Sequence, residues 1–389
     1  MKWHPEDERR WAVARVEAGD PVATVAAALH HSRDWVYTWC TRARTGDSGW
    51  TQDRSHRPSH LARLTPPEIV EAVRLVRLSL YNQGLLCGAQ NIRWELEELS
   101  VAPLPSVRTI NRILAREGLT HRRTGRYTPK GTPYPALPAE RPNQVHQVDY
   151  IGPCYLRGPV RFWSLNTVDV ATARGATEPV PTRANQATVD ALWATWQRLG
   201  VPTHVQADNE MVFYGSPAHP RGMGPLIRLC LPLGIEPWFI PLREPWRNGV
   251  VEKFNDHYRS KFLTRVAVPE AAALGPAHRA FEEKHNSRYR YSKLGGHTPL
   301  TALQRTGQPL RFLAKEAAPR VPLPKPEAGC YHLVRFIRSD RRLDIFGERF
   351  LLPPEAEYAY VVATVDVAQQ RLRVLLGAEL VAEFPYRLR

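Results

Sequence analysis

The 389-residue sequence lacks any long apolar run. No stretch approaches the roughly 18 uncharged apolar residues that mark a membrane-spanning helix. Its first residues, MKWHPEDERRW, also lack the apolar segment of a secretory signal peptide. We therefore expect no membrane span and no export signal, and we expect the protein to reside in the cytoplasm.

Cysteine is scarce, and no two cysteines form a CxxC pair. A disulfide framework and a cysteine zinc site are both unexpected, which fits a reducing compartment. The neighbouring His30 and His31 have no CxxC partner either, so we expect no zinc. The GxxxxGK[ST] pattern of P-loop ATPases is also absent. The five cysteines are Cys40, Cys87, Cys154, Cys230 and Cys330.

Lysine is rare as well, because 45 of the 53 basic residues are arginine. Arginine suits bidentate phosphate contacts, although a GC-rich genome that favours arginine codons would produce the same bias. Only 38 residues are acidic, which leaves a net charge of +15. The surplus lies mainly in residues 101–150, 251–300 and 301–350, whereas residues 1–100 are neutral. Such local charge predicts an anionic partner, and nucleic acid is the first candidate.

Residues 1–48 are predicted to form three helices, over 4–18, 21–29 and 33–44, with Ser32 as the cap of the third. Two short helices joined by a tight turn are typical of a helix-turn-helix unit. The alternative is a plain three-helix module with a solvated third helix. A polar linker is expected over 49–64. The side chains expected to contact DNA are Arg33, Tyr37, Arg42 and Arg44.

A second helix-turn-helix unit is predicted over 65–118. The sequence TPPE at 65–68 is typical of a capping box, and Ser106 is placed to cap the third helix, which ends before Gly118. One face of this helix carries arginines at every fourth position, and we expect it to bind DNA. A solvated basic face is the alternative. These arginines are Arg108, Arg112 and Arg116.

Residues 119–143 contain five prolines and several basic residues. This composition favours an extended linker that tracks a DNA backbone, with Arg122 and Arg123 as contacts. From 144 to 308 the pattern becomes that of a mixed α/β domain. Strands are expected over 145–151, 160–169, 172–180, 203–207 and 235–240, and helices over 186–199, 226–231 and 248–263.

Three carboxylates stand out within this domain. Asp149 lies inside an apolar strand, Asp208 ends another strand, and Glu252 lies in the first turn of a helix. Taken singly, each is more often a cap or a solvated residue. Taken together, they supply the hard oxygen ligands that Mg²⁺ prefers, and two such ions serve phosphoryl transfer.

The motifs around these carboxylates are distinctive. They are QVDY at 147–150, QADN at 206–209, PWRNGVVEKFN at 245–255, HNSR at 285–288 and LGGHTP at 294–299. With them, the sequence resembles the DDE transposases of the retroviral-integrase type, as found in many bacterial insertion sequences. The resemblance covers nearly the whole chain.

The resemblance implies a multidomain α/β protein with helix-turn-helix units, an RNase H-like core and a small C-terminal SH3-like β-barrel. Asp149, Asp208 and Glu252 would be the catalytic and metal-binding triad for two Mg²⁺ ions, with Mn²⁺ as a substitute. The implied activity is that of a DNA transposase or integrase, which cleaves at the 3′ ends of an element and transfers them into target DNA. A homo-oligomer on double-stranded DNA, in the nucleoid of a bacterium, is implied as well.

Two other functions remain open. One is a non-catalytic DNA-binding protein, either a domesticated transposase or a repressor of its own element. The other is a simple RNase H-like nuclease. The sequence also departs from the family pattern at two places. Forty-three residues separate Asp208 from Glu252, more than is usual, and the turn-rich stretch 214–222 is the expected insertion near the active site. Glu210 stands where the family usually has glycine.

The helix that follows Glu252 and the end of the chain complete the predictions. Val251, Phe254, Tyr258 and Phe262 have the spacing of a buried helix face, whereas Lys253 and Arg259 are expected to contact DNA. A basic, proline-bearing linker is expected over 309–329. Six short strands over 330–389 predict the barrel. Arg335 and Arg338 are its expected DNA contacts, with a purely structural barrel as the alternative.

Overall fold

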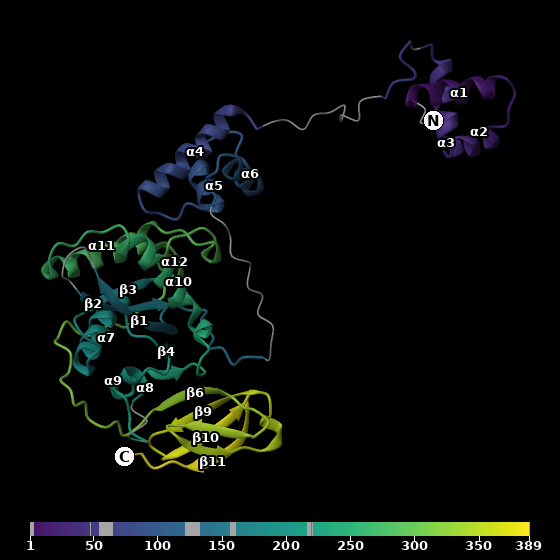
Figure 1. Cartoon of the computed structure of the whole chain (residues 1–389). Helices are drawn as coiled ribbons and strands as arrows, with labels where there is room; N and C mark the ends of the chain where they lie inside the picture. Colours follow the sequence, from purple (N-terminus) through teal and green to yellow (C-terminus); the bar gives the residue numbers. More distant parts are fainter. Residues whose placement is uncertain are drawn as a thin grey trace. The chain divides into compact units, whose positions relative to one another are not determined.

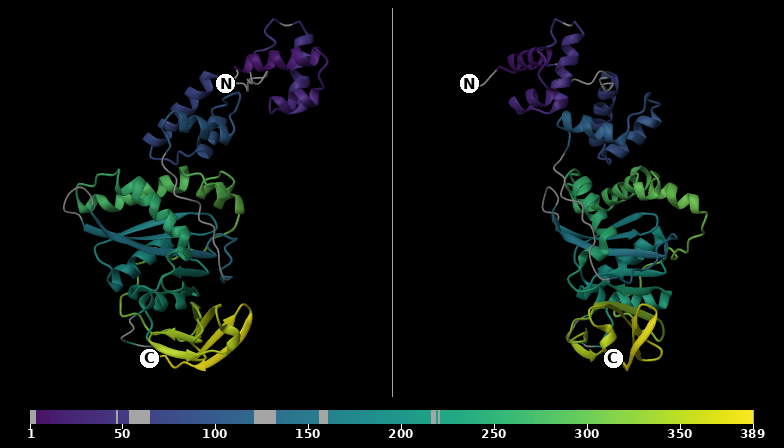
Figure 2. Two further views of the ribbon diagram at one scale, coloured as in Figure 1. Left: turned by 45° about the vertical axis from the view of Figure 1, so that its right-hand side comes forward. Right: turned by 90° about the vertical axis from the view of Figure 1, so that its right-hand side faces the viewer.

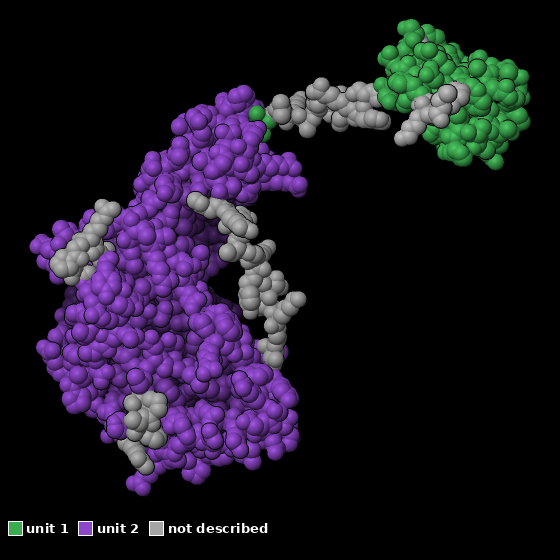
Figure 3. All heavy atoms as spheres, viewed as in Figure 1, with its two compact units in different colours: residues 1–65 green, residues 66–389 purple. Residues whose placement is uncertain are grey.

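The computed structural model describes residues 4–46, 48–53, 65–120, 133–155, 161–215, 219 and 221–388. The chain divides into two compact units, Met1–Thr65 and Pro66–Arg389 (Figure 3). In the described ranges, no helix has both the length and the apolar character needed to cross a bilayer.

The first unit contains the three predicted helices, α1 (Pro5–Glu17), α2 (Val22–Ala28) and α3 (Arg33–Arg44). Their apolar faces meet in a small core built from residues such as Val13, Val25 and Val36. The cap predicted at Ser32 is confirmed, because its Oγ accepts a hydrogen bond from the Trp35 amide at 3.2 Å. Residues 51–53 belong to this unit too, since Arg9 donates to the Thr51 carbonyl and to Asp53 at 2.6 Å each.

The second unit begins with another three-helix cluster, α4 (Pro67–Asn82), α5 (Ala89–Glu98) and α6 (Val107–Arg116). The cap predicted at Ser106 is confirmed by its 3.1 Å hydrogen bond from the Thr109 amide. The predicted capping box at 65–68 is wrong. Pro66 occupies the N-cap and has no side chain that accepts a hydrogen bond, so Thr65 lies one residue too early.

A nine-stranded mixed sheet forms the centre of the second unit, with strand order β11-β10-β9-β6-β5-β4-β1-β2-β3. Strands β1, β2 and β3 are antiparallel neighbours, whereas β4 and β5 run parallel to β1. The strand expected from residue 172 begins only at Gly175, because Asp169 and Thr172 form a hydrogen-bonded turn. The core strands are β1 (Val145–Tyr155), β2 (Arg161–Asp169), β3 (Gly175–Val180), β4 (His204–Ala207) and β5 (Glu236–Phe239).

Helices cover both faces of these five strands (Figures 1 and 2). Helices α10 (Gly249–Tyr258), α11 (Leu274–Arg288) and α12 (Pro299–Thr306) lie on one side. Helices α7 (Asn185–Leu199), α8 (Met211–Tyr214) and α9 (Pro225–Cys230) lie on the other. Helix α10 continues as a π-helical turn to Leu263, and the buried face predicted for it is confirmed. The α/β character predicted for 144–308 is therefore found.

The C-terminal strands extend the same sheet. Strand β6 pairs in parallel with β5 through Trp238↔His332 and Phe239↔Leu333, and β9, β10 and β11 follow it antiparallel. The predicted barrel is not confirmed. All six short strands occur, and four of them continue the core sheet through the two residue pairs between β5 and β6. They are β6 (Cys330–Phe336), β9 (Tyr360–Asp366), β10 (Arg371–Leu376) and β11 (Glu379–Pro385), with β7 (Arg342–Ile345) and β8 (Glu348–Leu351) as a hairpin.

The stretch 309–329, expected as a linker, has no helix or strand, yet it is attached to the core. The Val321 amide donates to Gln186 Oε1 at 2.8 Å, and Trp193 Nε1 donates to the Glu316 carbonyl at 3.0 Å. Both partners lie on α7. The hydrogen bonds fix the course of this segment across the helix, so it differs from a free spacer.

Candidate functional site

Asp149 lies in the middle of β1, directly opposite Asn166 of β2 in the strand register. Its carboxylate is half-buried, and its Oδ2 accepts a hydrogen bond from Asn255 Nδ2 of α10 at 2.7 Å. An aspartate in this central strand therefore faces α10 across the sheet surface. This contact joins the strand to the helix that carries Glu252.

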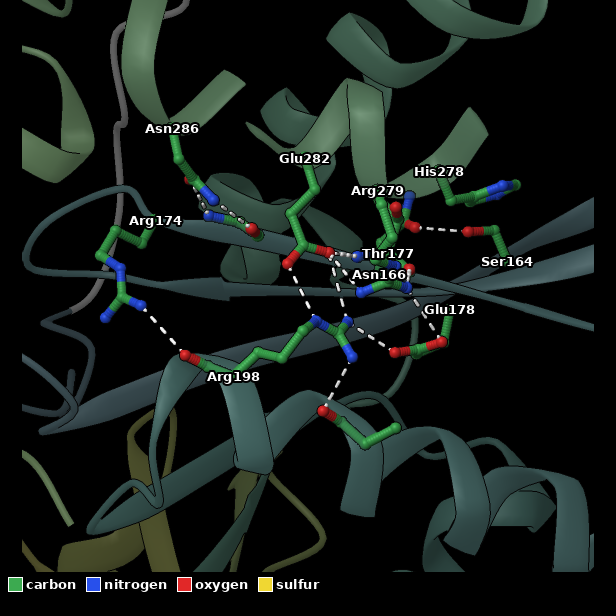
Figure 4. Close-up of polar contacts among 12 residues, drawn as sticks. Ser164, Asn166, Arg174, Thr177, Glu178, Arg198, His278, Arg279, Glu282 and Asn286 are labelled. Atoms are coloured by element: carbon green, nitrogen blue, oxygen red, sulfur yellow. Dashed lines mark hydrogen bonds and ion pairs between the residues drawn. The ribbon is translucent and has the colours of Figure 1, made fainter. Parts of the chain in front are cut away.

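The bond to Asp149 is the last of three consecutive hydrogen bonds. Ser164 Oγ donates to Asn166 Oδ1 at 2.6 Å, and Asn166 Nδ2 donates to Asn255 Oδ1 at 2.8 Å. All three donors are buried; Ser164 and Asn166 appear in Figure 4. Because an amide nitrogen only donates and an amide oxygen only accepts, the bond from Asn255 Nδ2 to Asp149 sets the direction of the whole chain of donors. Ser164 and Asn166 were not predicted from the sequence, where their only signal is polarity inside an apolar strand.

Asp208 follows the last residue of β4 directly. Its Oδ1 accepts from the Glu210 amide at 3.0 Å, which fixes the turn behind the strand. The extra carboxylate of Glu210 forms a 2.7 Å ion pair with Arg183, and both side chains are partly exposed. Glu210 therefore has a cationic partner of its own at this site.

Glu252 lies in the first turn of α10, and the start of that helix is fastened to the sheet. Gln147 Oε1 accepts from the amides of Val250 and Val251 at 2.9 and 3.1 Å. Gln206 Nε2 donates to the Arg247 carbonyl at 2.9 Å. Each glutamine precedes a candidate catalytic aspartate by two residues, so the strands that carry the aspartates also orient the helix of Glu252. The two glutamines were not predicted as site residues, although the repeated Gln-x-Asp pattern is a signal for them.

Asp149 and Glu252 share an open cavity of about 310 Å³. Two expected DNA contacts, Lys253 and Arg259, line it as well, and both are exposed with ion-pair distances of 3.8 Å to Asp256. Asp208 is absent from the described lining. The lining consists of Asp149, Gly249, Glu252, Lys253, Asn255, Asp256 and Arg259.

The acidic side chains nevertheless share one electrostatic environment. Burial raises the pKa of Asp149 to about 7, and the nearby charges of Asp208, Glu210 and Glu252 contribute to that rise. Burial also raises the pKa of Asp208 to about 6, with Glu210 adding to the effect while the Glu210 amide and Arg183 oppose it. Several partly buried carboxylates thus repel one another, which is the situation that a bound cation relieves.

The donor set fits a hard divalent cation by its chemistry, since it consists of carboxylate oxygens. The geometry is less complete. Among the described residues, no group of three or more His, Cys, Asp or Glu side chains gathers closely enough to hold a metal ion. The structure therefore brings Asp149 and Glu252 to one cavity and places Asp208 near enough to act on the charge of Asp149. The described residues do not close a three-carboxylate site.

The remaining sequence-predicted DNA contacts fall into three groups. On α3, Arg33, Tyr37 and Arg44 are exposed, whereas Arg42 is half-buried with its guanidinium 4.4 Å from the centre of the Trp39 ring. Arg122 and Arg123 lie outside the described residues. On α6, Arg108, Arg112 and Arg116 are exposed on one face, and Arg338 is exposed just after β6.

The prediction that Arg335 contacts DNA is wrong. The residue was expected on the surface of the C-terminal strands, yet only 6% of it is exposed. Its Nη2 donates to Asn209 Oδ1 at 2.9 Å, beside Asp208. The alternation of β6 places this arginine on the inner side of the strand, so it is not a surface contact for DNA.

A network of charged side chains closes the core on the α11 side (Figure 4). Glu282 of α11 pairs with Arg198 of α7 at 3.0 Å and with Arg279 at 2.9 Å, and Arg279 also reaches Glu178 of β3 at 3.0 Å. In the HNSR motif, Asn286 exchanges two 2.9 Å hydrogen bonds with the backbone of Gly175. The motif downstream of Glu252 therefore fastens α11 to the edge strand β3.

No protein-family model matches the chain, and no curated protein matches its sequence. Among solved structures, the magnesium-bound integrase catalytic core domain of HTLV-2 aligns with 43% of this chain and 99% of its own length, at 18% identity and a TM-score of 0.33. The integrase catalytic core of BIV aligns with 42% of the chain and 96% of its own length, at 19% identity and a TM-score of 0.31. A chain of the simian T-cell lymphotropic virus intasome, in complex with the PP2A regulatory subunit B56 gamma, aligns with 79% of this chain and 97% of its own length, at 15% identity and a TM-score of 0.38.

Proposed function

We propose that the protein is a DNA transposase of the insertion-sequence type, which cuts the 3′ ends of an element and joins them to target DNA. It is expected to act in the bacterial cytoplasm, on the nucleoid, as a homo-oligomer that pairs two element ends. The observation that carries the proposal is the position of the carboxylates. Asp149 and Glu252 share a cavity with exposed cations, and Asp208 lies close enough to raise the pKa of Asp149.

In this proposal Asp149, Asp208 and Glu252 would hold two Mg²⁺ ions, or Mn²⁺ in their place. Bound there, the ions would activate the attacking oxygen and stabilise the leaving one. Asn255 orients Asp149, while Gln147 and Gln206 hold the helix of Glu252. The exposed Lys253 and Arg259 at the cavity suit the phosphodiester backbone, which needs cationic partners.

Two phosphoryl transfers would follow at one site, a hydrolysis and then a transesterification. Water attacks the phosphodiester at the element end, the P–O3′ bond breaks, and a free 3′-hydroxyl remains. That hydroxyl then attacks a phosphodiester of the target in line, forming a new P–O3′ bond as the P–O3′ bond of the target breaks. No covalent enzyme intermediate is needed, because the joining step replaces one phosphodiester bond of the target directly with another.

Recognition of the element ends is assigned to the two three-helix clusters. Ser32 caps α3 and Ser106 caps α6, and both helices present exposed arginines away from their cores. Such a helix fits the major groove, where base edges are read. The cluster α4–α6 contributes the denser charge, with three arginines on one face.

The main alternative is a DNA-binding protein without catalysis, such as an element repressor. The absence of a closed three-carboxylate group among the described residues favours it. A simple nuclease is the second alternative, and it would cut DNA without joining ends.

The test is a reaction of the purified protein with Mg²⁺, a labelled duplex from the DNA flanking its gene, and a target plasmid. We expect wild type to nick the duplex and join it to the plasmid. Asp149→Asn, Asp208→Asn and Glu252→Gln should each abolish both products. Asp190→Asn, on an exposed part of α7, is the matched control and should remain active. Binding without any product in wild type would identify the repressor, and cutting without joining would identify the nuclease.

A further inference from the structure

The residue after Asp208 is held by the C-terminal strands. Asn209 Nδ2 donates to the Ile240 carbonyl at 2.6 Å, at the end of β5, and its Oδ1 accepts from Arg335 Nη2 of β6 at 2.9 Å. The two bonds use both ends of the amide. The orientation of the peptide that follows Asp208 is therefore tied to the point where β5 and β6 pair.

Arg335 is an unusual residue for this position. Its guanidinium also donates to the carbonyls of Val334 and Ile240, at 2.9 and 3.4 Å, while its Nε has no hydrogen-bond partner in the described chain. No carboxylate of the described residues lies within the 4.0 Å of an ion pair. A buried charge without an ion pair costs stability unless hydrogen bonds satisfy it, and here its partners are the Asn209 side chain and two backbone carbonyls. Packing alone therefore does not account for Arg335.

The loop that follows Asn209 meets the C-terminal hairpin at two further places. The ring of Tyr214 stacks on Phe346 with 3.9 Å between the ring centres and 4° between the planes. Arg221 Nε donates to both carboxylate oxygens of Glu348 at 2.9 Å. The stretch expected to be an insertion beside the active site is thus fastened, in its described part, to the β7–β8 hairpin.

We propose that the C-terminal sheet is part of the active-site architecture, with Arg335 acting through Asn209 as a positioning residue for Asp208. This inference rests on the proposed function, since it gives Asp208 a role in holding metal. It assigns the sheet a task other than DNA contact. Loss of the Arg335 bond would leave the Asn209 amide held only by the Ile240 carbonyl, and the segment that positions the Asp208 carboxylate would become more mobile.

The discriminating variant is Arg335→Met, which keeps most of the buried length and removes all donors. Arg373→Met is the matched control, because Arg373 lies on β10 of the same sheet in partly exposed ion pairs with Asp366 and Glu383. We expect Arg335→Met to stay folded but to unfold at a moderately lower temperature than wild type, because Asn209 Oδ1 and the Val334 carbonyl lose a donor. Amide exchange in the segment 206–214 should become faster, and Mg²⁺ binding by calorimetry should weaken at least tenfold, the lower end for residues that orient ligands.

Kinetics separate positioning from DNA contact. At saturating Mg²⁺, Arg335→Met should lower kcat and leave the KM for DNA unchanged, and Asn209→Ala should do the same. The double variant should be no worse than Asn209→Ala alone, because Arg335 acts on Asp208 only through Asn209. Arg373→Met should match wild type in exchange and in Mg²⁺ binding.

Three results would overturn the inference: unchanged exchange in 206–214, unchanged Mg²⁺ binding in an active wild-type background, or a raised KM for DNA with kcat intact. A wild type that neither binds Mg²⁺ nor processes DNA would instead remove the proposed function. In that case the exchange comparison still decides whether Arg335 holds the Asp208 segment.

Discussion

The chain of buried hydrogen bonds that ends on Asp149 can be broken from its far side, at Asn166. Replacing Asn166 with leucine keeps a branched side chain of similar size on β2 but removes both polar atoms. Asn255 Oδ1 then loses its 2.8 Å donor and Ser164 Oγ loses its 2.6 Å acceptor. Neither group has ready access to solvent, since Asn255 is 1% and Ser164 0% exposed.

The cost follows from the number of groups left without partners. Each buried polar group that loses its partner costs about 1–3 kcal/mol. Asn166→Leu leaves two such groups and should lower the free energy of unfolding by about 2–6 kcal/mol. Ser164→Ala leaves only Asn166 Oδ1 without a donor, so it should cost about 1–3 kcal/mol. Urea denaturation of the three proteins measures both values.

The functional effect should accompany the loss of stability. Once Asn255 is no longer held by Asn166, its amide is free to turn away from Asp149, and Mg²⁺ binding should weaken by about tenfold to a hundredfold. A smaller cost for Asn166→Leu than for Ser164→Ala, or wild-type Mg²⁺ binding in Asn166→Leu, would refute the account of a directed chain of donors.

Three further predictions concern charge. Burial lowers the pKa of His146 and His257 to about 3 and of His278 and His285 to about 4. Unfolding therefore takes up protons between about pH 6.5 and 4, and the urea concentration at the unfolding midpoint should fall as the pH drops through this window. The raised pKa values of Asp149 and Asp208 oppose this fall only in part. A midpoint that stays constant over this window would contradict the prediction. Replacing Arg108, Arg112 and Arg116 with glutamine should make binding to the element ends less dependent on salt. The slope of the logarithm of the binding constant against the logarithm of the salt concentration should fall by about one for each of these arginines that binds a phosphate, whereas an unchanged slope would place the DNA elsewhere. Glu282→Gln should lower the free energy of unfolding by about 1–3 kcal/mol, because Arg198 and Arg279 each lose one carboxylate partner but keep Glu178, and an unchanged free energy would show this pairing to be dispensable.

Local patterns predicted the elements better than the contacts between them. The spacing of Val251, Phe254 and Tyr258 predicts a buried helix face, and that face is found. The pairing of β5 with β6 depends on two residue pairs between strands that are far apart in the sequence. No local periodicity encodes such a partner, and the C-terminal strands were therefore expected to form a separate barrel.

The dependence on contacts between distant segments also explains which candidate site residues the sequence indicated and which it missed. Asp149, Asp208 and Glu252 stand out because carboxylates in or beside apolar elements are costly without a partner. Asn166 and Ser164 are neutral and small, and nothing in their spacing distinguishes a buried polar pair from solvated strand residues. Arg335 was expected to be an exposed DNA contact of a C-terminal barrel. Its burial depends on β6 lying against β5, a contact that the sequence does not reveal.

The central claim is that Asp149, Asp208 and Glu252 act as one metal-binding set. Calorimetric titration of Mg²⁺ into DNA-free wild type, Asp149→Asn, Asp208→Asn, Glu252→Gln and the control Asp190→Asn tests it directly. The account predicts binding in wild type and in the control, and its loss in each of the other three variants. Wild-type Mg²⁺ affinity in Asp208→Asn, the one member outside the cavity shared by Asp149 and Glu252, would contradict it.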